Sequence, residues 1–353
     1  MKPISTICLM ISLVALNAMG SGLYLMSKGD MRPCYIKYVI RTTESNTQLE
    51  ITPRKVATLT QWYPEYRNSP WSVKCDGVEF EYTPYDNIRG GSEATGESLS
   101  GGCSNAAPAA MTLTKPGNHA VRIYNQGDNI FKLVFQTNYV IAISVNWESI
   151  SSASKLPAWT AQSCPNLEYI YYANPTGSVN KLAGFTNLPK LKHLEFKNPD
   201  KYNKIDAYQL YSIQEVTNSF TFANVEEVGT YVFYNAGNVP YFGVPKAKKI
   251  GNQVMQKLAG GTGLHTLLVG DVLEEVGNLA FGGQNNLTTI EFATSAQDWI
   301  GAWNSHPILP NLFGTATASQ VEGEATLTPL AEKPSIWASS STYPTPTLLK
   351  LAR

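Results

Sequence analysis

One pattern occurs three times in the second half of the chain, as Val225-Glu-Glu-Val-Gly-Thr-Tyr-Val-Phe233, Lys248-Lys-Ile-Gly-Asn-Gln-Val-Met255 and Leu273-Glu-Glu-Val-Gly-Asn-Leu-Ala-Phe281. In each copy a β-branched residue precedes a glycine. A large apolar residue follows five positions after the β-branched residue. A repeat period of about 20 to 30 residues with this apolar pattern is typical of coils stacked into a solenoid.

A short run with apolar residues at fixed spacing follows each copy: Val239-Pro-Tyr-Phe-Gly-Val244, Leu264-His-Thr-Leu-Leu-Val269 and Leu287-Thr-Thr-Ile-Glu-Phe292. The spacing apolar-x-x-apolar-x-apolar predicts a short strand with three inward side chains, so the residues between them point outward. One such unit cannot bury its own apolar side. Neighbouring units must therefore stack to make a continuous core.

This alternation resembles the BspA-like leucine-rich repeats of bacterial cell surfaces. That family alternates Ile-Gly-x-x-Ala-Phe with Leu-x-x-Ile-x-Ile, and Val276-Gly-Asn-Leu-Ala-Phe281 followed by Leu287-Thr-Thr-Ile-Glu-Phe292 matches it well. The other copies depart from it, with Met255 in the Phe position and Pro240 inside a strand, where proline removes a ladder hydrogen bond. The resemblance implies a protein that adheres to host or matrix proteins or to other cells.

Composition excludes some partners. The 353 residues are 43% hydrophobic and carry 27 Lys and Arg against 27 Asp and Glu. A net charge of zero argues against nucleic acid or an anionic membrane as an electrostatically attracted partner. The 19 tyrosines outnumber the 12 phenylalanines, and an excess of this amphipathic aromatic suits a recognition surface or an ordinary sheet face.

Residues 1–20 have the pattern of a secretory signal peptide. Lys2 precedes the apolar run from Ile7 to Leu16, and Ala18-Met-Gly20 supplies small residues for cleavage. The apolar run is too short for a membrane span. We therefore expect an exported protein with no membrane span after signal removal. The alternative is a non-native extension, with Met26 or Met31 as the true start.

Signal removal leaves Cys34, Cys75, Cys103 and Cys164, which allow three pairings. Cys75 and Cys103 flank a Gly/Ser-rich insertion and are the favoured disulfide, whereas Cys164 is expected to be a buried thiol. No two cysteines are close in sequence and only 4 histidines are present. We therefore expect no metal site.

Residues 31–146 are expected to form an antiparallel β-sandwich, because short strand-like runs follow one another closely. Asp76-Gly77 is a strong hairpin signal. Trp71 with this turn, and Lys115-Pro-Gly-Asn-His-Ala-Val-Arg-Ile123, resemble motifs of PKD-type, immunoglobulin-like modules. The resemblance covers only part of this domain.

Repeats are expected to fill residues 147–300, where Cys164-Pro-Asn-Leu-Glu-Tyr-Ile-Tyr-Tyr172 and Leu188-Pro-Lys-Leu-Lys-His-Leu-Glu-Phe196 are two further strand segments. The fold class is therefore mainly β, a sandwich followed by an irregular leucine-rich repeat solenoid. Prolines recur through residues 301–353 and favour turns and extended chain. We expect an end cap there, which an open array requires, followed by an extended terminus.

No phosphate-loop, zinc-protease or hydrolase motif is found in the sequence, so we expect neither enzymatic activity nor a cofactor. Glu226-Glu227 and Glu274-Glu275 recur at equivalent positions. Paired carboxylates suit acid–base chemistry or calcium, but a repeated polar pair on a solvated turn is the favoured interpretation. Gly260-Gly-Thr-Gly263 lacks the Lys-Ser/Thr of a phosphate loop and is expected to lengthen a turn.

Residues between the inward side chains define a candidate ligand-binding face. Stacked repeats present long surfaces that bind ligands, although tyrosine and threonine are favoured on any solvent-facing sheet. The face consists of Tyr169, Tyr171, His193, Glu195, Tyr241, Thr266, Leu268, Thr289 and Glu291.

These features favour a secreted or cell-surface binding protein. Its expected partner is a protein or glycan on a cell surface or matrix. Two alternatives stay open. A fibre protein of a bacteriophage tail or head is favoured if the chain starts at Met31. A carbohydrate-binding surface protein is compatible with the tyrosine-rich face.

Overall fold

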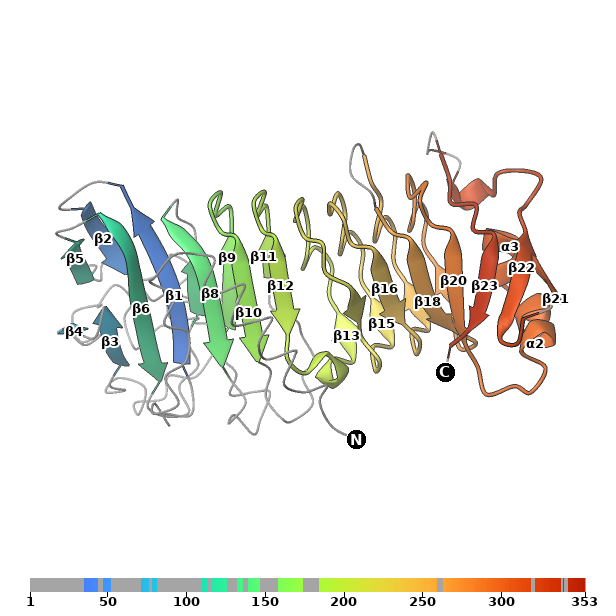
Figure 1. Ribbon diagram of the computed structural model, residues 1–353, viewed down its shortest axis with the longest axis horizontal. Coiled ribbons are helices and arrows are strands. Elements are labelled where there is room, and N and C mark those ends of the chain that lie inside the picture. The colour runs from blue at the N-terminus through green and yellow to red at the C-terminus, as the bar shows by residue number, and fades with distance from the viewer. Residues whose placement is uncertain are drawn as a thin grey trace, which may run out of the picture.

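The coils of the protein form one elongated stack, with strands from successive coils side by side along its length (Figure 1). The expected signal peptide and Cys103 lie outside the residues that the structure describes. The computed structural model describes residues 35–43, 47–51, 71–75, 78–80, 109–113, 116–125, 132–135, 139–146, 158–173, 184–258, 263–318, 321–337, 339 and 342–352.

Each repeat contributes one short strand to each of two parallel sheets, so the predicted solenoid is confirmed. The first sheet contains β14 (Phe220–Thr221), β16 (Tyr241–Val244), β18 (Thr266–Gly270) and β20 (Thr289–Ala293). The second sheet contains β13 (Lys204–Ile205), β15 (Glu227–Val228), β17 (Lys249–Ile250) and β19 (Glu275–Val276). Neighbouring strands pair in parallel at equivalent positions of the repeat.

A continuous apolar core runs through the coils. The ring of Phe233 lies 5.3 Å from those of Phe220 and Phe242, so the far side of one coil packs across the core onto the first sheet. Burying each large apolar side chain contributes about 1.5–3 kcal/mol. The inward positions predicted from the repeat pattern are buried and none lies in a helix: Phe233, Val239, Met255, Leu264, Phe281 and Leu287.

The glycine of the repeat pattern lies where successive coils touch. A Cβ atom at Gly251 would lie 2.8 Å from the carbonyl carbon of Gly229, and one at Gly277 would lie 2.5 Å from the backbone nitrogen of Asn252. Both distances are far inside van der Waals contact. Any larger residue at these positions would therefore push neighbouring coils apart.

After each strand of the second sheet, the chain follows the side of the coil opposite the first sheet. We call this side the back flank; it comprises residues 206–214, 229–237, 251–258 and 277–284. Tyr208 and Tyr231 have left-handed φ angles of 62° and 60° there. The Tyr208 N–H donates to the Thr230 carbonyl at 3.1 Å, and the Tyr231 N–H donates to the Asn252 carbonyl at 3.0 Å. The coils are therefore hydrogen-bonded to one another along this flank as well.

The N-terminal strands continue the stack of coils. A single sheet has the order β12-β10-β8-β1-β6-β3-β4, in which β8 pairs antiparallel with β1 and parallel with β10. The sandwich was expected to end at residue 146, but strands from before and after this residue are hydrogen-bonded in the same sheet. The strands are β1 (Tyr35–Thr42), β3 (Trp71–Cys75), β4 (Val78–Phe80), β6 (Gly117–Asn125), β8 (Val140–Asn146), β10 (Tyr169–Ala173) and β12 (His193–Phe196).

A separate antiparallel sandwich is not confirmed by the described residues, nor is its PKD-like character. The predicted hairpin is present, because β3 and β4 pair antiparallel with Cys75 opposite Val78. Antiparallel strands at the start of the stack cover a sheet edge that would otherwise be open. The other N-terminal strands are β2 (Thr47–Ile51) paired with β5 (Ala109–Leu113), and β7 (Lys132–Phe135), β9 (Ala158–Gln162) and β11 (Gly184–Thr186) in a parallel sheet.

Between β12 and β14 the sheet is interrupted. In the preceding coil, the buried residues Leu191 and Leu194 have two residues between them. In this coil, the corresponding buried residues Val216 and Phe220 have three residues between them. The side-chain oxygen of Asn218 accepts a hydrogen bond of 3.0 Å from the Leu194 N–H. A side chain thus satisfies a backbone donor that has lost its strand partner. The 3-10 turn η4 (Pro199–Lys201) precedes this coil.

The C-terminal tail adds further strands to the first sheet. β23 (Leu348–Leu351) pairs in parallel with β20, and β22 (Glu324–Thr328) and β21 (Thr315–Ala318) follow in antiparallel order. The chain end that was expected to be an extended terminus is therefore a paired strand.

Two short helices, α2 (Trp299–Ser305) and α3 (Leu309–Phe313), lie at the end of the core. The ring of Trp303 lies 5.4 Å from that of Phe292. α3 contains a proline in its first turn, where the missing N–H has no helical partner to lose. In the part of the chain that the structure describes, no helix has the length and hydrophobicity that a membrane span needs.

Replacing Phe281 by alanine should lower the free energy of unfolding by about 3–5 kcal/mol, because the change leaves a cavity in the core. The Phe281 ring is 1% exposed and lies 6.2 Å from that of Phe313 and 6.4 Å from that of Trp337. Urea denaturation followed by circular dichroism measures the effect. Leu258→Ala, at a side chain 62% exposed, is the control and should change stability by less than about 0.5 kcal/mol. An unchanged midpoint for Phe281→Ala would contradict the packing described.

Candidate functional site

The nine residues of the predicted ligand-binding face occupy outward positions on strands of the repeat coils. They form two groups separated by the coil of β14, where the sheet is interrupted. The first group, on β10 and β12, is Tyr169, Tyr171, His193 and Glu195, and the second, on β16, β18 and β20, is Tyr241, Thr266, Leu268, Thr289 and Glu291.

In the first group, strand pairing places Tyr169 beside His193 and Tyr171 beside Glu195. The Tyr169 and His193 rings are 6.0 Å apart, and the Tyr169 hydroxyl donates to Glu195 Oε2 at 3.4 Å. Burial and the Glu195 charge raise the pKa of Tyr169, so its phenol keeps its proton and acts as a donor. His193 and Glu195 are exposed. This group therefore offers aromatic and charged side chains to solvent in a fixed arrangement.

In the second group, the side chain of Tyr241 lies across the sheet and covers its neighbours. The Tyr241 hydroxyl donates to Glu291 Oε2 at 2.6 Å, across the strand that lies between them. A Cβ atom at Gly243 would lie 3.2 Å from Tyr241 Cε1 and 3.1 Å from Leu268 Cδ2, so the ring crosses the sheet over a residue without a side chain. Leu268 is consequently only 8% exposed. Burial and the hydrogen bond to Glu291 raise the pKa of Tyr241.

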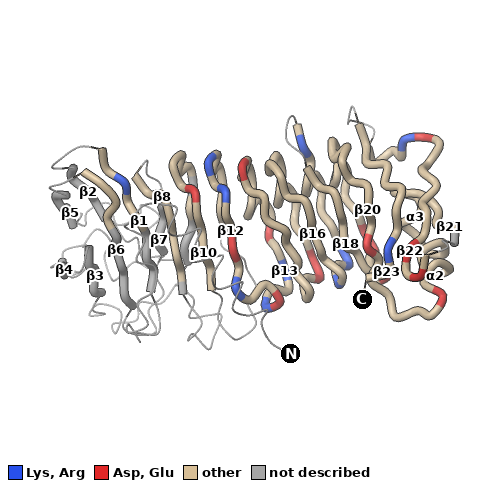
Figure 2. The backbone as a smooth tube through the Cα atoms, viewed as in Figure 1, with Lys and Arg blue, Asp and Glu red and all other residues tan. Residues whose placement is uncertain are grey.

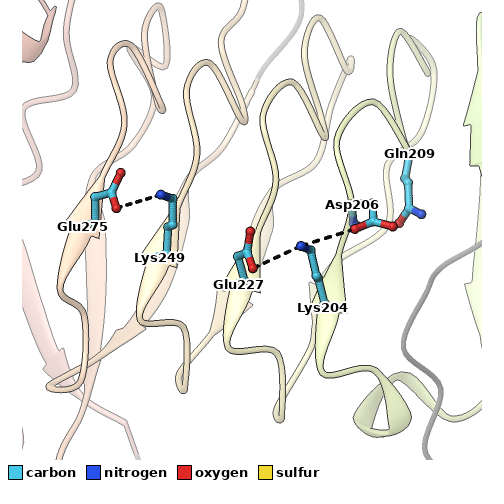
Figure 3. Close-up of polar contacts among 6 residues, drawn as sticks. All are labelled: Lys204, Asp206, Gln209, Glu227, Lys249 and Glu275. Carbon is cyan, nitrogen blue, oxygen red and sulfur yellow. Dashed lines mark hydrogen bonds and ion pairs between the residues drawn. The ribbon is translucent and has the colours of Figure 1, made fainter.

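The recurring carboxylates lie opposite lysines of the neighbouring coils. The second sheet aligns Lys204, Glu227, Lys249 and Glu275 in one row, so cation and anion alternate along the stack. Figure 3 shows two ion pairs in this row, Lys204 Nζ to Glu227 at 3.1 Å and Lys249 Nζ to Glu275 at 2.8 Å. Exposed pairs stabilise a fold only slightly.

A second charged row runs beside the first. Lys248 Nζ lies 3.0 Å from Glu226 Oε2, and its hydrogen bond to that carboxylate, with a smaller contribution from Glu274, raises the pKa of Lys248. Blue and red segments accordingly lie close together on successive coils between β13 and β18 (Figure 2). The carboxylate pairs thus neutralise lysines of neighbouring coils, which agrees with their interpretation as a solvated polar pair.

Among the described residues, no three His, Cys, Asp or Glu side chains are placed to hold a metal ion. The expected Cys75–Cys103 disulfide involves a residue outside the described part of the chain. Cys164 is buried in the core. Most of the turn Gly260-Gly-Thr-Gly263 also lies outside the described residues, although Gly263 has a left-handed φ of 69°.

One side-chain cluster was missed by the sequence reasoning. Tyr208, Tyr211, Tyr231 and Tyr234 lie together on the back flank, with ring centroids 5.0 Å apart for the pair 208 and 231 and 5.3 Å apart for the pair 211 and 234. The signal was present as Tyr-x-x-Tyr at equivalent positions of two successive coils. These positions lie outside the strand runs from which outward residues were predicted.

The parallel short strands, the stacked core and the repeat pattern define a leucine-rich repeat solenoid. Residues 144–262 match the family model described as the BspA type Leucine rich repeat region, in 6 copies. This stretch is therefore similar to the BspA type of leucine-rich repeat, as the resemblance implied. The copy from Leu273 to Phe292 lies beyond the matched residues and continues the same stack through β19 and β20. No curated protein and no solved structure matched the chain.

The substitution Tyr241→Phe tests the hydrogen bond between Tyr241 and Glu291, through the pH dependence of protein stability. At neutral pH the hydroxyl bond to Glu291 should stabilise the fold by about 0.5–1.5 kcal/mol. Above the ordinary tyrosine pKa of about 10, the unfolded chain releases the phenol proton while the folded chain keeps it. The stabilisation therefore falls as pH rises. Urea unfolding at several pH values should show the difference between wild type and variant shrinking between about pH 9 and 11.

The control for this experiment is Tyr208→Phe, which removes a hydroxyl that makes no hydrogen bond among the described residues. It should show no comparable difference in stability. A difference between wild type and Tyr241→Phe that stays constant across the pH range would contradict the role given to Glu291.

Proposed function

We propose that this chain is an exported, non-enzymatic binding protein of the cell surface whose outward sheet face holds a protein or glycan ligand. The proposal is supported by the BspA-type repeat region, since leucine-rich repeats are typically binding domains. The signal-like residues 1–20 support export. The fibre protein of a phage particle stays the alternative.

The observation that carries the proposal is the arrangement of the first group. Its four side chains come from two adjacent strands whose pairing fixes their relative positions. The Tyr169 hydroxyl is already held by Glu195, and Tyr169 also packs against a small apolar cluster on β1 and β8. Side chains that are ordered before binding lose less conformational entropy when a ligand arrives. The first group is thus a better ligand platform than the second.

The chemistry of the face supports binding more than catalysis. The raised pKa values of Tyr169 and Tyr241 keep both phenols protonated, so neither acts as a base near neutral pH. Glu195 and Glu291 each accept a tyrosine hydroxyl and belong to separate groups. A pair of carboxylates flanking one substrate bond, as glycoside hydrolysis requires, is therefore not formed by these two residues.

The double substitution Tyr171→Ala with His193→Ala should weaken ligand binding by about tenfold or more, because aromatic side chains at the centre of a contact carry much of its energy. Binding of the labelled full chain is measured on arrays of matrix proteins and of glycans. Glu226→Ala, on the charged rows, is the matched surface control and should bind as wild type does. Equal affinity of wild type and the double variant would rule out the first group as the binding surface.

Export is tested by the mature N-terminus. We expect mass spectrometry of the protein recovered from the cell surface or medium to show a chain beginning close to residue 21, because Ala18-Met-Gly20 has the small residues that signal peptidase requires. A chain that begins at Met31 and is recovered in virus particles would instead favour the phage alternative.

A further inference from the structure

The four tyrosines of the back flank form a two-by-two array. Backbone hydrogen bonds set their positions, since the Tyr208 N–H donates to Thr230 and the Ser212 N–H donates to the Tyr234 carbonyl at 2.9 Å. The rings of Tyr208 and Tyr231 are inclined by 15°, and those of Tyr211 and Tyr234 by 5°. We call this cluster the tyrosine array. It lies across the core from the first sheet, so it is a different surface from the candidate face.

The tyrosine array is open to solvent. Tyr208 is 52% exposed, and Tyr211, Tyr231 and Tyr234 are half-buried. In the described part of the chain, none of the four hydroxyls makes a hydrogen bond. This contrasts with Tyr169 and Tyr241, whose hydroxyls are held by carboxylates. The array therefore presents aromatic surface together with unused donors and acceptors.

The core does not require tyrosine at these positions. The apolar residues that fill the coil here are the neighbouring Leu210, Val232 and Phe233, which are buried. Tyr208 and Tyr231 both adopt a left-handed φ, which costs a bulky residue more than it costs asparagine or glycine. Two large aromatic residues therefore occupy positions where asparagine or glycine would adopt the backbone conformation at lower cost. Gln253 and Leu279 hold the same left-handed conformation at the equivalent positions of the following coils, so this backbone does not itself require an aromatic residue.

The surroundings of the array carry few charged side chains. Residues 207–214, 229–240 and 250–256 contain no Lys, Arg, Asp or Glu. Lys257, the next residue, is turned inward, because its Nζ donates to the Gly237 carbonyl at 2.6 Å and burial lowers its pKa. Asp206 lies beside Lys204, at 3.6 Å (Figure 3). The back flank therefore presents no cluster of like charge to an ionic partner, since Asp206 is paired with Lys204 and Glu215, after the first segment, is a single exposed carboxylate.

An amide pair continues the array in the next coil. Gln253 and Gln256 occupy the positions equivalent to Tyr231 and Tyr234, as the backbone hydrogen bonds from Tyr231 to Asn252 and from Asn235 to Gln256 show. The Gln253 side-chain nitrogen donates to the Gln256 side-chain oxygen. One edge of the aromatic array is thus lined by groups that both donate and accept hydrogen bonds.

We propose that the tyrosine array binds a neutral glycan, with a pyranose ring against the Tyr208 and Tyr231 edge and hydroxyls bonded to the phenols and glutamines. A pyranose has apolar C–H faces and a hydroxyl rim, which complements amphipathic aromatics flanked by amides. Four rings from two adjacent coils present less surface than the roughly 800 Å² that a stable protein interface buries on each partner. The site therefore suits one or two sugar units, and it does not depend on the sheet face.

The test uses the labelled full chain on an array of neutral and acidic di- to tetrasaccharides, followed by calorimetric titration of the neutral sugars bound. The variant is Tyr208→Asn with Tyr231→Asn. Asparagine accepts left-handed φ more readily than tyrosine, so the variant should melt no lower than wild type. We expect saturable binding of a neutral oligosaccharide by wild type and affinity about tenfold or more lower in the variant. The control is Tyr139→Ala, which removes an exposed tyrosine (41%) outside the tyrosine array. It should leave the affinity for the sugar unchanged.

Three outcomes would overturn the proposal. The first is the absence of saturable binding to any neutral sugar at millimolar concentration. The second is sugar binding that Tyr171→Ala abolishes and the double asparagine variant leaves intact, since this would place the glycan on the sheet face. The third is an array-dependent partner that is a protein. Binding lost only in the asparagine variant would support the tyrosine array even if the sheet face bound nothing.

Discussion

No coil of this protein can bury its apolar side chains alone, and every other feature of the structure depends on the stacking that this requires. Phe233 reaches across its own coil to Phe242, and glycines such as Gly251 let the backbones of neighbouring coils approach. Once the coils are stacked, each outward position becomes a row along the molecule. The residues at one repeat position therefore form a continuous row on the surface, as the alternating Lys204, Glu227 and Lys249 show.

The three sides of the coil differ in chemistry because they differ in backbone conformation. The first sheet is extended, so outward and inward residues alternate and Tyr241 can reach Glu291 two strands away. The short strands of the second sheet carry the paired charges. The back flank is neither helical nor extended, and its left-handed residues direct the side chains of Tyr208 and Tyr231 to solvent. One coil therefore exposes a sheet face and a back flank, with a charged row between them.

Sequence reasoning succeeded where local pattern determines burial. The inward positions of the repeat, from Phe233 to Leu287, follow from spacing alone, and the outward positions on β10 to β20 follow from the same spacing. It failed where the answer depends on pairing between distant segments. Nothing local indicates that β8 pairs with both β1 and β10, or that Leu348–Leu351 returns to β20. The tyrosine array was missed because its positions belong to a flank whose conformation has no simple periodicity.

The reversal of strand direction at the end of the stack has a consequence for self-association. A parallel ladder such as that of β16, β18 and β20 is a template onto which a second molecule could add its own strand, and repeated addition gives fibrils. Here β23 occupies that edge, and β22 and β21 then run antiparallel to it. A chain shortened by proteolysis before residue 315 would expose the Thr289–Ala293 edge with its Ile290 and Phe292 rungs. The tail thus acts as a terminator that keeps the solenoid finite.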